Sequence, residues 1–485
     1  MLNRLGRRVF LGALGLGAGM GAIGTGAAGS GKAERGGGGS VRAKPAGLRE
    51  EVAALVNRTP FVDTHEHLYE ESRRIQGRED PKEAGVASAD IGMLFSHYAD
   101  SDLQVAGMDP MDVQRIRRPG RSPKEKWALI EPHYAAARHT GYVRNVRLSV
   151  QMLYGENDIH TGNVEAISEK LRAGVRPGMN KRILQDVANI EYCQVNDVTG
   201  ELLFRRTAEP ALLTQDLSFV PLLLPTSSHI GRVAGEMGME AGSFAAWLEC
   251  VDKVFATHAP RAIAMKSQQA YNRGLDYARV PREDAKPKFE KLLNAPDELA
   301  AADHAAVQDF MFHYCVEKSV EHKLPVKLHT GYYAGSGSMP LGRVGGNPGE
   351  MCDMLMAHKD ARFVFMHITY PYQDEAIAVA KQHPNAWIDM CWAWIINPSA
   401  SVRFLKEFLK AAPANKIFTF GGDYMPVELV PGHAAIARQG ITQALCELVE
   451  ERWMREDDLP ELVERLMRGN AHGMFDYEKT QQNWG

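Results

Sequence analysis

The segment Phe61-Val62-Asp63-Thr64-His65-Glu66-His67-Leu68 places two histidines, two residues apart, directly after a short apolar run. Residues 59–62 have the length and composition of a buried β-strand. In an extended chain, residues i and i+2 point to the same side, so His65 and His67 can present two imidazole rings to one ion. The sequence holds 17 histidines in 485 residues, so such a pair can arise by chance. The position of the two histidines in the fold therefore decides whether they indicate a metal site.

Short apolar runs alternate with longer amphipathic stretches from residue 48 onward. This alternation predicts βα units, which build a parallel sheet with helices outside it. Eight such units predict an α/β protein with the (β/α)8 fold, the TIM barrel. The expected strands are 59–62, 190–195, 217–224, 262–265, 325–328, 363–366, 386–390 and 417–420.

The segment between the first two expected strands, residues 69–186, is far longer than an ordinary connection in a barrel. Helical patterns at 110–117, 123–137 and 162–173 predict a mostly helical insertion over the barrel mouth. Its aromatic and basic residues, among them Arg144, are weak candidates for a substrate pocket, because arginine-rich surface helices are common.

The first residues predict export. Arg7-Arg8-Val9-Phe10-Leu11 precedes a run of Gly, Ala, Leu and Met, which is typical of a twin-arginine secretory signal over residues 1–30. The run is too short and too rich in glycine to make a stable membrane anchor. We therefore expect the twin-arginine export machinery to deliver the protein to the periplasm or the cell exterior. Residues 31–47 read as a flexible linker, and residues 48–485 as the barrel domain.

Composition excludes some partners. The net charge of -4 and the lack of a dense Lys/Arg stripe argue against nucleic acid. The six cysteines are widely spaced without a Cys-x-x-Cys pair, so they are expected to be buried thiols. A small-molecule substrate is the expected partner, and the oligomeric state stays open.

Four further titratable residues follow expected strands at the level of the first histidine pair. They are Lys266, His329, His367 and Asp423. The carboxyl ends of barrel strands form the face where active sites are built, so we expect these side chains to converge with the pair. Imidazoles with one carboxylate suit zinc and similar divalent ions. Such an ion lowers the pKa of bound water to near 7, and Asp423 is placed to take its proton, to ligate, or both.

Four motifs together resemble the amidohydrolase superfamily, especially its uronate-isomerase-like and amidohydrolase-2 branch. The resemblance covers residues 59–430 and rests on Val62-Asp-Thr-His-Glu-His67, Met265-Lys-Ser-Gln-Gln-Ala-Tyr-Asn-Arg-Gly-Leu275, Lys327-Leu-His-Thr-Gly331 and Phe420-Gly-Gly-Asp423. It implies that the metal ligands are His65, His67, His329 and Asp423.

The resemblance leaves two forms of the site open. In binuclear members of the superfamily, a carboxylated lysine at the position of Lys266 bridges two ions. In the amidohydrolase-2 branch one ion is usual, and the lysine can instead bind a substrate carboxylate. We expect one zinc ion, with two as the alternative. The expected catalytic residues are Asp423, His367 and Lys266.

Aromatic and basic side chains near the strand ends are candidates for substrate contacts. They are Tyr271, Arg273, Tyr332 and Trp392. The residues favour an exported hydrolase that attacks a C–N or C–O bond of a small, carboxylate-bearing substrate with metal-activated water. A uronate-type isomerase or a non-oxidative decarboxylase on the same barrel is one alternative. An exported binding protein without catalysis is another.

Overall fold

The computed structural model describes residues 47–79, 89–197, 203–223 and 225–484. The expected signal segment and the expected linker, apart from Gly47, lie outside these residues. Every pair of neighbouring strands is parallel. The strands are β1 (Phe61–Glu66), β2 (Ile190–Val195), β3 (Leu213–Gln215), β4 (Leu217–Ser218), β5 (Met265–Ser267), β6 (Val326–Leu328), β7 (Phe363–Phe365), β8 (Ala386–Asp389) and β9 (Ile417–Phe418).

The strands close into a barrel. The ladders β1-β2-β3 and β4 to β9 are joined where Ile263 N donates to Gln215 O over 2.9 Å. At the other seam, Thr64 N donates to Phe420 O over 3.1 Å. Since only Asp216 separates β3 from β4, these two pieces form one strand, and the barrel has eight. The expected (β/α)8 fold is confirmed.

Several expected strand boundaries were wrong, and the fourth strand, expected at 262–265, is β5 at Met265–Ser267. The third strand begins at Leu213 and not at residue 217, and Val220–Leu223 forms the short helix α10. Pro221 has no N–H for a strand ladder, which is why the apolar run leaves the sheet. At β1, Thr59 N still donates to Leu55 O of helix α1 (Leu48–Arg58), so the strand starts only at Phe61.

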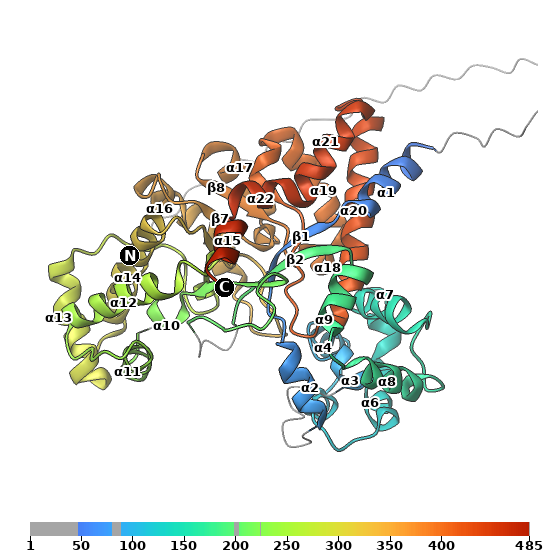
Figure 1. Cartoon of the computed structure of the whole chain (residues 1–485), viewed down its shortest axis with the longest axis horizontal. Coiled ribbons are helices and arrows are strands. Elements are labelled where there is room, and N and C mark those ends of the chain that lie inside the picture. Colours follow the sequence, from blue (N-terminus) through green and yellow to red (C-terminus); the bar gives the residue numbers. More distant parts are fainter. Residues whose placement is uncertain (1–46, 80–88, 198–202, 224, 485) are drawn as a thin grey trace, which may run out of the picture. The chain divides into compact units, whose positions relative to one another are not determined.

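The described part of residues 69–186 folds into helices. In Figure 1 they run in colour from blue to green. The start of helix α6 could be predicted from the sequence because Ser122 and Glu125 form a capping box and Pro123 occupies the first turn. The helices are α2 (Glu71–Glu79), α3 (Ile91–Leu94), α4 (Ala99–Val105), α5 (Pro110–Arg117), α6 (Pro123–Ala137), α7 (Gly141–Tyr154), α8 (Val164–Gly174), α9 (Met179–Lys181) and the π-helical turn η1 (Arg182–Val187).

No helix among the described residues is long and apolar enough to cross a membrane. The remaining helices follow the later strands or the end of the barrel. They are α11 (Ser227–Glu236), α12 (Phe244–His258), α13 (Arg282–Asn294), α14 (Ala301–Glu321), α15 (Leu341–Glu350), α16 (Cys352–Ala357), α17 (Gln373–Gln382), α18 (Ala393–Ile396), α19 (Pro398–Ala411), α20 (Val430–Glu450), α21 (Leu459–Glu464), α22 (Asn470–Met474) and α23 (Tyr477–Gln482).

Candidate metal centre

Three of the expected ligands meet at one point. His65 Nε2 and His67 Nε2 lie 3.1 and 3.2 Å from Oδ1 of Asp423. The ligand atoms of the three residues lie within 4.8 Å of one another, and all three side chains are buried. The pair of histidines at the end of β1 is therefore joined to a carboxylate that follows β9, its neighbour across the closing seam.

The hydrogen bonds around His65, His67 and Asp423 leave ring nitrogens that a bound cation would satisfy. Nδ1 of His67 lies 2.8 Å from the carbonyl oxygen of Asn196, which can only accept, so Nδ1 carries the ring proton. In the neutral ring Nε2 then has a lone pair, and that lone pair faces the Asp423 carboxylate. Neither ring nitrogen of His65 has a hydrogen-bond partner among the described residues. Two imidazoles and a carboxylate suit a divalent ion, which would relieve both conflicts.

His329 and His367 also face each other with ring nitrogens that both lack a proton. Nδ1 of His367 contacts the carbonyl oxygen of Cys391 at 3.0 Å, and Nε2 of His329 contacts that of Tyr332 at 3.0 Å. Each neutral ring therefore places its proton there, and the two remaining nitrogens face each other at 3.0 Å. A proton or a cation between them would remove the repulsion. The structure thus pairs His329 with His367 next to the first three ligands.

Burial keeps these histidines neutral. It lowers the pKa of His65 to about 4 and that of His367 to about 3, and it also lowers the pKa of His329 well below its usual value. Neutral imidazole is the form that binds metal ions. At neutral pH the rings are therefore already in the state that a ligand requires.

Lys266 lies among these groups. Its Nζ is fully buried and has no hydrogen-bond partner among the described residues. Burial lowers its pKa to about 8, although the charges of Asp423, Cys391 and Asp216 oppose that shift. An amine in this state is available to a substrate oxygen, to an ion or to carbon dioxide. The geometry is compatible with both forms of the site that the sequence left open.

A cavity of about 360 Å³ opens at three of the expected ligands, His67, His329 and Asp423. Its lining combines ligand candidates with neutral polar side chains and includes no lysine or arginine from the described residues. The lining residues are His67, His97, Tyr98, Val220, Gln268, Tyr271, Asn272, His329, Ala334 and Asp423. The cavity therefore offers a small polar substrate direct access to the ligands.

The insertion contributes two lining residues that the sequence did not reveal. The hydroxyl of Tyr98 donates to Asp423 Oδ2 over 2.6 Å. Met425 N donates to Nδ1 of His97 over 3.1 Å. Both residues precede helix α4, and no periodicity relates that position to the strand ends of the barrel. The sequence signal available was only the presence of aromatic residues in a long insertion.

Three of the four expected substrate residues lie near the ligands. Tyr271 lines the cavity, and its ring packs against His329 with centroids 4.4 Å apart. Trp392 stacks on Tyr98 at 4.6 Å and lies 5.8 Å from Tyr332.

The fourth, Arg273, is engaged elsewhere. Its guanidinium lies 2.7 Å from Asp309 and donates to Gln308 over 3.2 Å, both in helix α14. Arg273 is outside the set of residues that line the cavity. A contact with bound substrate would require it to give up these partners.

A buried ion pair between Lys327 and Asp216, here called the barrel floor, lies next to His65. Lys327 Nζ donates to both carboxylate oxygens of Asp216 at 2.9 Å and to the carbonyl oxygen of Thr64 at 2.8 Å. Asp216 Oδ2 lies 3.9 Å from Nδ1 of His65. This pair, which the sequence did not reveal, supports the β1 end that carries the histidines.

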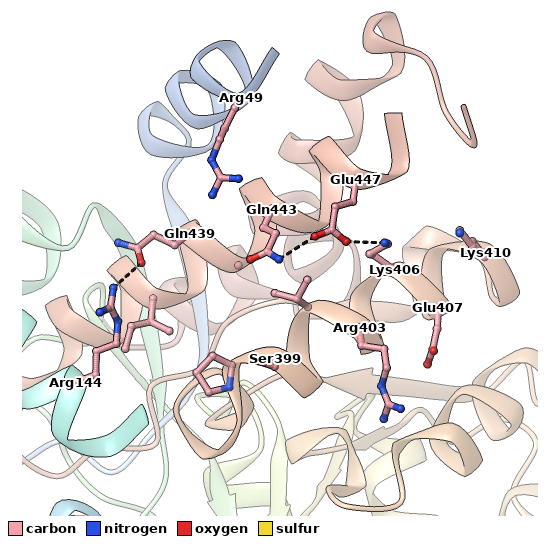
Figure 2. Close-up of a pocket in the computed structure, with 14 residues that line it drawn as sticks. Arg49, Arg144, Ser399, Arg403, Lys406, Glu407, Lys410, Gln439, Gln443 and Glu447 are labelled. Carbon is pink, nitrogen blue, oxygen red and sulfur yellow. Dashed lines mark hydrogen bonds and ion pairs between the residues drawn. The ribbon is translucent and has the colours of Figure 1, made fainter. Parts of the chain in front are cut away.

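A separate hollow of about 660 Å³ lies between α7, α19 and α20 (Figure 2). Lys406 and Gln443 both reach Glu447 there, and Arg144 donates to Gln439 over 3.2 Å. Of the residues that the sequence offered for the site, only Arg144 lines this hollow. Arg144 of the insertion therefore belongs to this surface and not to the cavity at the ligands.

Several solved structures share the barrel fold. A uronate isomerase from Thermotoga maritima superposes with a TM-score of 0.70 at 14% identity, covering 88% of this chain and 97% of that one. A glucuronate isomerase from Caulobacter crescentus gives 0.68 at 16%, covering 89% and 94%. A putative metal-dependent hydrolase from Lactobacillus casei gives 0.58 at 16%, covering 89% and 98%.

Sequence comparison finds more limited matches. Protein fluG of Emericella nidulans is 21% identical over 178 residues, which is 34% of this chain and 20% of that protein. The chain therefore matches about a fifth of this relative's length. A family model described as Amidohydrolase matches residues 261–477, from the approach to β5 through β9 to the terminal helices. Over residues 261–477 the chain is therefore similar to the Amidohydrolase family, and it shares its barrel fold with the two isomerases and the hydrolase.

Proposed function

We propose that this chain is a hydrolase that holds a divalent ion, zinc by preference, and cleaves a C–N or C–O bond of a small polar substrate. The observation that supports this most directly is that His65 Nε2 and His67 Nε2 meet one oxygen of Asp423. When bound, the ion would supply Lewis-acid activation of water and polarisation of a substrate oxygen. We expect one ion, held by these three residues. The facing nitrogens of His329 and His367 would complete its coordination or hold a second ion.

Asp423 is the proposed general base. Burial alone would raise the pKa of this carboxyl, but the adjacent imidazoles of His65 and His67 hold it well below its usual range. Tyr98 binds Oδ2, so the orientation of the carboxylate is fixed. Asp423 is therefore ionised at neutral pH and can accept the proton of the attacking water.

Lys266 and His367 are proposed to orient and polarise the substrate. Lys266 Nζ is unpartnered among the described residues and can pair with a carboxylate or a developing oxyanion of the substrate. The neutral side chains Gln268 and Asn272 line the cavity and can bind further polar groups. Because no lysine or arginine of the described residues lines the cavity, recognition of a substrate carboxylate would depend on the ion, and contact with the buried Lys266 would require the substrate to reach past the lining residues.

A uronate-type isomerase is the second candidate. The observation that favours it is the extent of the likeness to two isomerases, which includes the insertion because 88% and 89% of this chain are covered. Isomerisation would use the same carboxylate and tyrosine to move a proton between neighbouring carbons. A non-oxidative decarboxylase and an exported binding protein are weaker alternatives. Export through the twin-arginine pathway is part of the proposal and is supported by the sequence Arg7–Leu11.

A substrate panel would test the proposal. Purified protein reconstituted with zinc or manganese would be assayed against lactones, N-acyl amino acids and uronic acids. Turnover of lactones or N-acyl compounds is expected, and its loss in the His65→Ala variant together with the bound metal would support the site. Isomerisation of a uronic acid alone would favour the second candidate. No turnover, with less than one ion per chain, would refute the enzymatic proposal.

A further inference from the structure

Two carboxyl groups are buried behind the metal centre. Asp63 and Glu66 are both 0% exposed; Asp63 Oδ2 and Glu66 Oε1 receive no hydrogen bond from any other described residue, and the two carboxyl groups are hydrogen-bond partners when they share a proton. Burial of a carboxyl group destabilises the fold unless its oxygens are hydrogen-bonded, so two buried carboxyl groups at one place indicate a specific role. Neither residue is among the ligands or lines the cavity.

Their other oxygens bind the turn that carries Asp423. Tyr424 N donates to Glu66 Oε2 over 2.6 Å, and Gly422 N donates to Asp63 Oδ1 over 3.3 Å. Asp423 N itself donates to the carbonyl oxygen of His65 over 3.0 Å. Three consecutive backbone amides of the turn are therefore held by residues of β1.

The turn needs this support because its conformation is unfavourable. Asp423 has φ of 61°, in the left-handed region that is unfavourable for a residue with a Cβ. Such a conformation persists only where the surroundings determine it. Gly422 permits the close approach, since a Cβ at that position would lie 1.9 Å from Glu66 Oε1.

The contacts along β1 and just after it explain why this glutamate is available. His65 and His67 direct their Nε2 atoms at Asp423 Oδ1. Glu66, between them in sequence, instead binds the backbone of the turn after β9 through Tyr424 N. The same six residues of β1 thus supply one ligand directly and fix the position of another.

We propose that Glu66, with Asp63 as its partner, is a positioning residue that holds Asp423 Oδ1 against His65 and His67. This inference rests on the proposed function only in taking Asp423 as a ligand. The glutamate between the two histidines then acts on the metal centre through the backbone of the opposite strand.

The test compares Glu66→Gln with Glu66→Ala in the full-length protein. Each would be loaded with Co²⁺, whose visible spectrum reports ligand geometry, and its affinity for Zn²⁺ would be measured against a chromophoric chelator. The glutamine keeps an oxygen for Tyr424 N, so its spectrum is expected to match the wild type. The alanine variant is expected to bind Zn²⁺ about 10- to 100-fold more weakly, the usual effect of removing a group that orients a ligand, and to show a changed spectrum.

A purely structural role predicts another result. The alanine variant would then unfold at a lower temperature, while its folded form kept the wild-type affinity and Co²⁺ spectrum. That outcome would overturn the proposal, and so would loss of affinity in both variants alike. Neither readout depends on turnover, so a failure of the hydrolase proposal would leave this test intact.

Gly422→Ala provides a second route should Glu66→Ala fail to fold. It keeps both carboxyl groups but forces Glu66 away from Tyr424 N, and the same loss of Zn²⁺ affinity is expected. Gly473→Ala is the matched control, because a Cβ there meets nothing within 4 Å. Equal affinities in the two glycine variants would refute the proposal.

Discussion

The hydroxyl of Tyr98 donates a hydrogen bond to Oδ2 of Asp423 over 2.6 Å and so joins the helical insertion to a proposed metal ligand. Tyr98 itself has φ of 69°, and Trp392, which stacks on it, has φ of 63°. Strained backbone of this kind gathers at functional sites, because surrounding contacts must maintain it. The insertion is thus in direct contact with the candidate metal centre.

Replacement of Tyr98 by phenylalanine is expected to lower kcat about 10- to 100-fold, because a hydrogen bond to a charged group is worth about 1.5–3 kcal/mol. The ion should remain, since its proposed protein ligands are unchanged. Steady-state kinetics and metal analysis of the purified variant would measure both. Tyr142→Phe is the control, because Tyr142 stacks on Tyr98 at 5.3 Å and lies one ring away from Asp423. Equal activity of the two variants would contradict a role for the hydroxyl.

Removal of the ion is expected to destabilise the protein. His67 Nε2 and Asp423 Oδ1 remain 3.2 Å apart without a cation between them, and binding to the folded state alone adds about 2.7 kcal/mol at 100-fold excess over Kd. Thermal unfolding with zinc and with a chelator would show the difference as a lower Tm after chelation. His65→Ala should show a much smaller difference. The same zinc-dependent shift in that variant would place the ion elsewhere.

The sequence revealed those parts of the site that are attached to strands. His329, His367 and Asp423 could be predicted because the carboxyl ends of parallel strands meet at one face, whatever the connections between them. Tyr98 could not, because its place depends on how the helices of an insertion pack over that face. Arg273 was misleading for a related reason, since nearness to Lys266 in sequence says little once the chain turns at Gln269–Tyr271.

The barrel floor shows the same limit. Lys327 sits inside an apolar strand, and Asp216 lies where a strand was expected to begin only one residue later. Nothing in either segment indicates that the two side chains pair across β5. A charged side chain inside a strand pairs with residues that only the closed barrel brings near. The strands were therefore easier to predict than the ion pair inside the barrel.

Replacement of Lys327 by methionine is expected to destabilise the fold by about 3–5 kcal/mol, because it leaves the Asp216 carboxylate buried without its cation. Urea unfolding at pH 7 would measure the change. The double variant Lys327→Met, Asp216→Asn should recover part of the loss, since the uncompensated charge is gone. Arg465→Gln, which breaks the exposed pair with Glu461, should cost less than about 1 kcal/mol. Equal costs for the two single variants would contradict this account of the barrel floor.

Mild acid is expected to destabilise the protein through a histidine pair outside the metal centre. His313 Nδ1 and His358 Nε2 lie 2.8 Å apart, and burial lowers the pKa of each from about 6.5 to about 4. The unfolded chain therefore takes up protons first as the pH falls, and stability present above pH 6.5 is lost between pH 6.5 and 4. Each histidine should contribute a loss on the order of 1–2 kcal/mol between pH 7 and pH 5. Urea unfolding of His313→Gln should show a shallower pH dependence than the wild type, whereas His139→Gln, at an exposed position, should follow the wild type. Parallel curves for all three proteins would show that the pair does not cause the acid sensitivity.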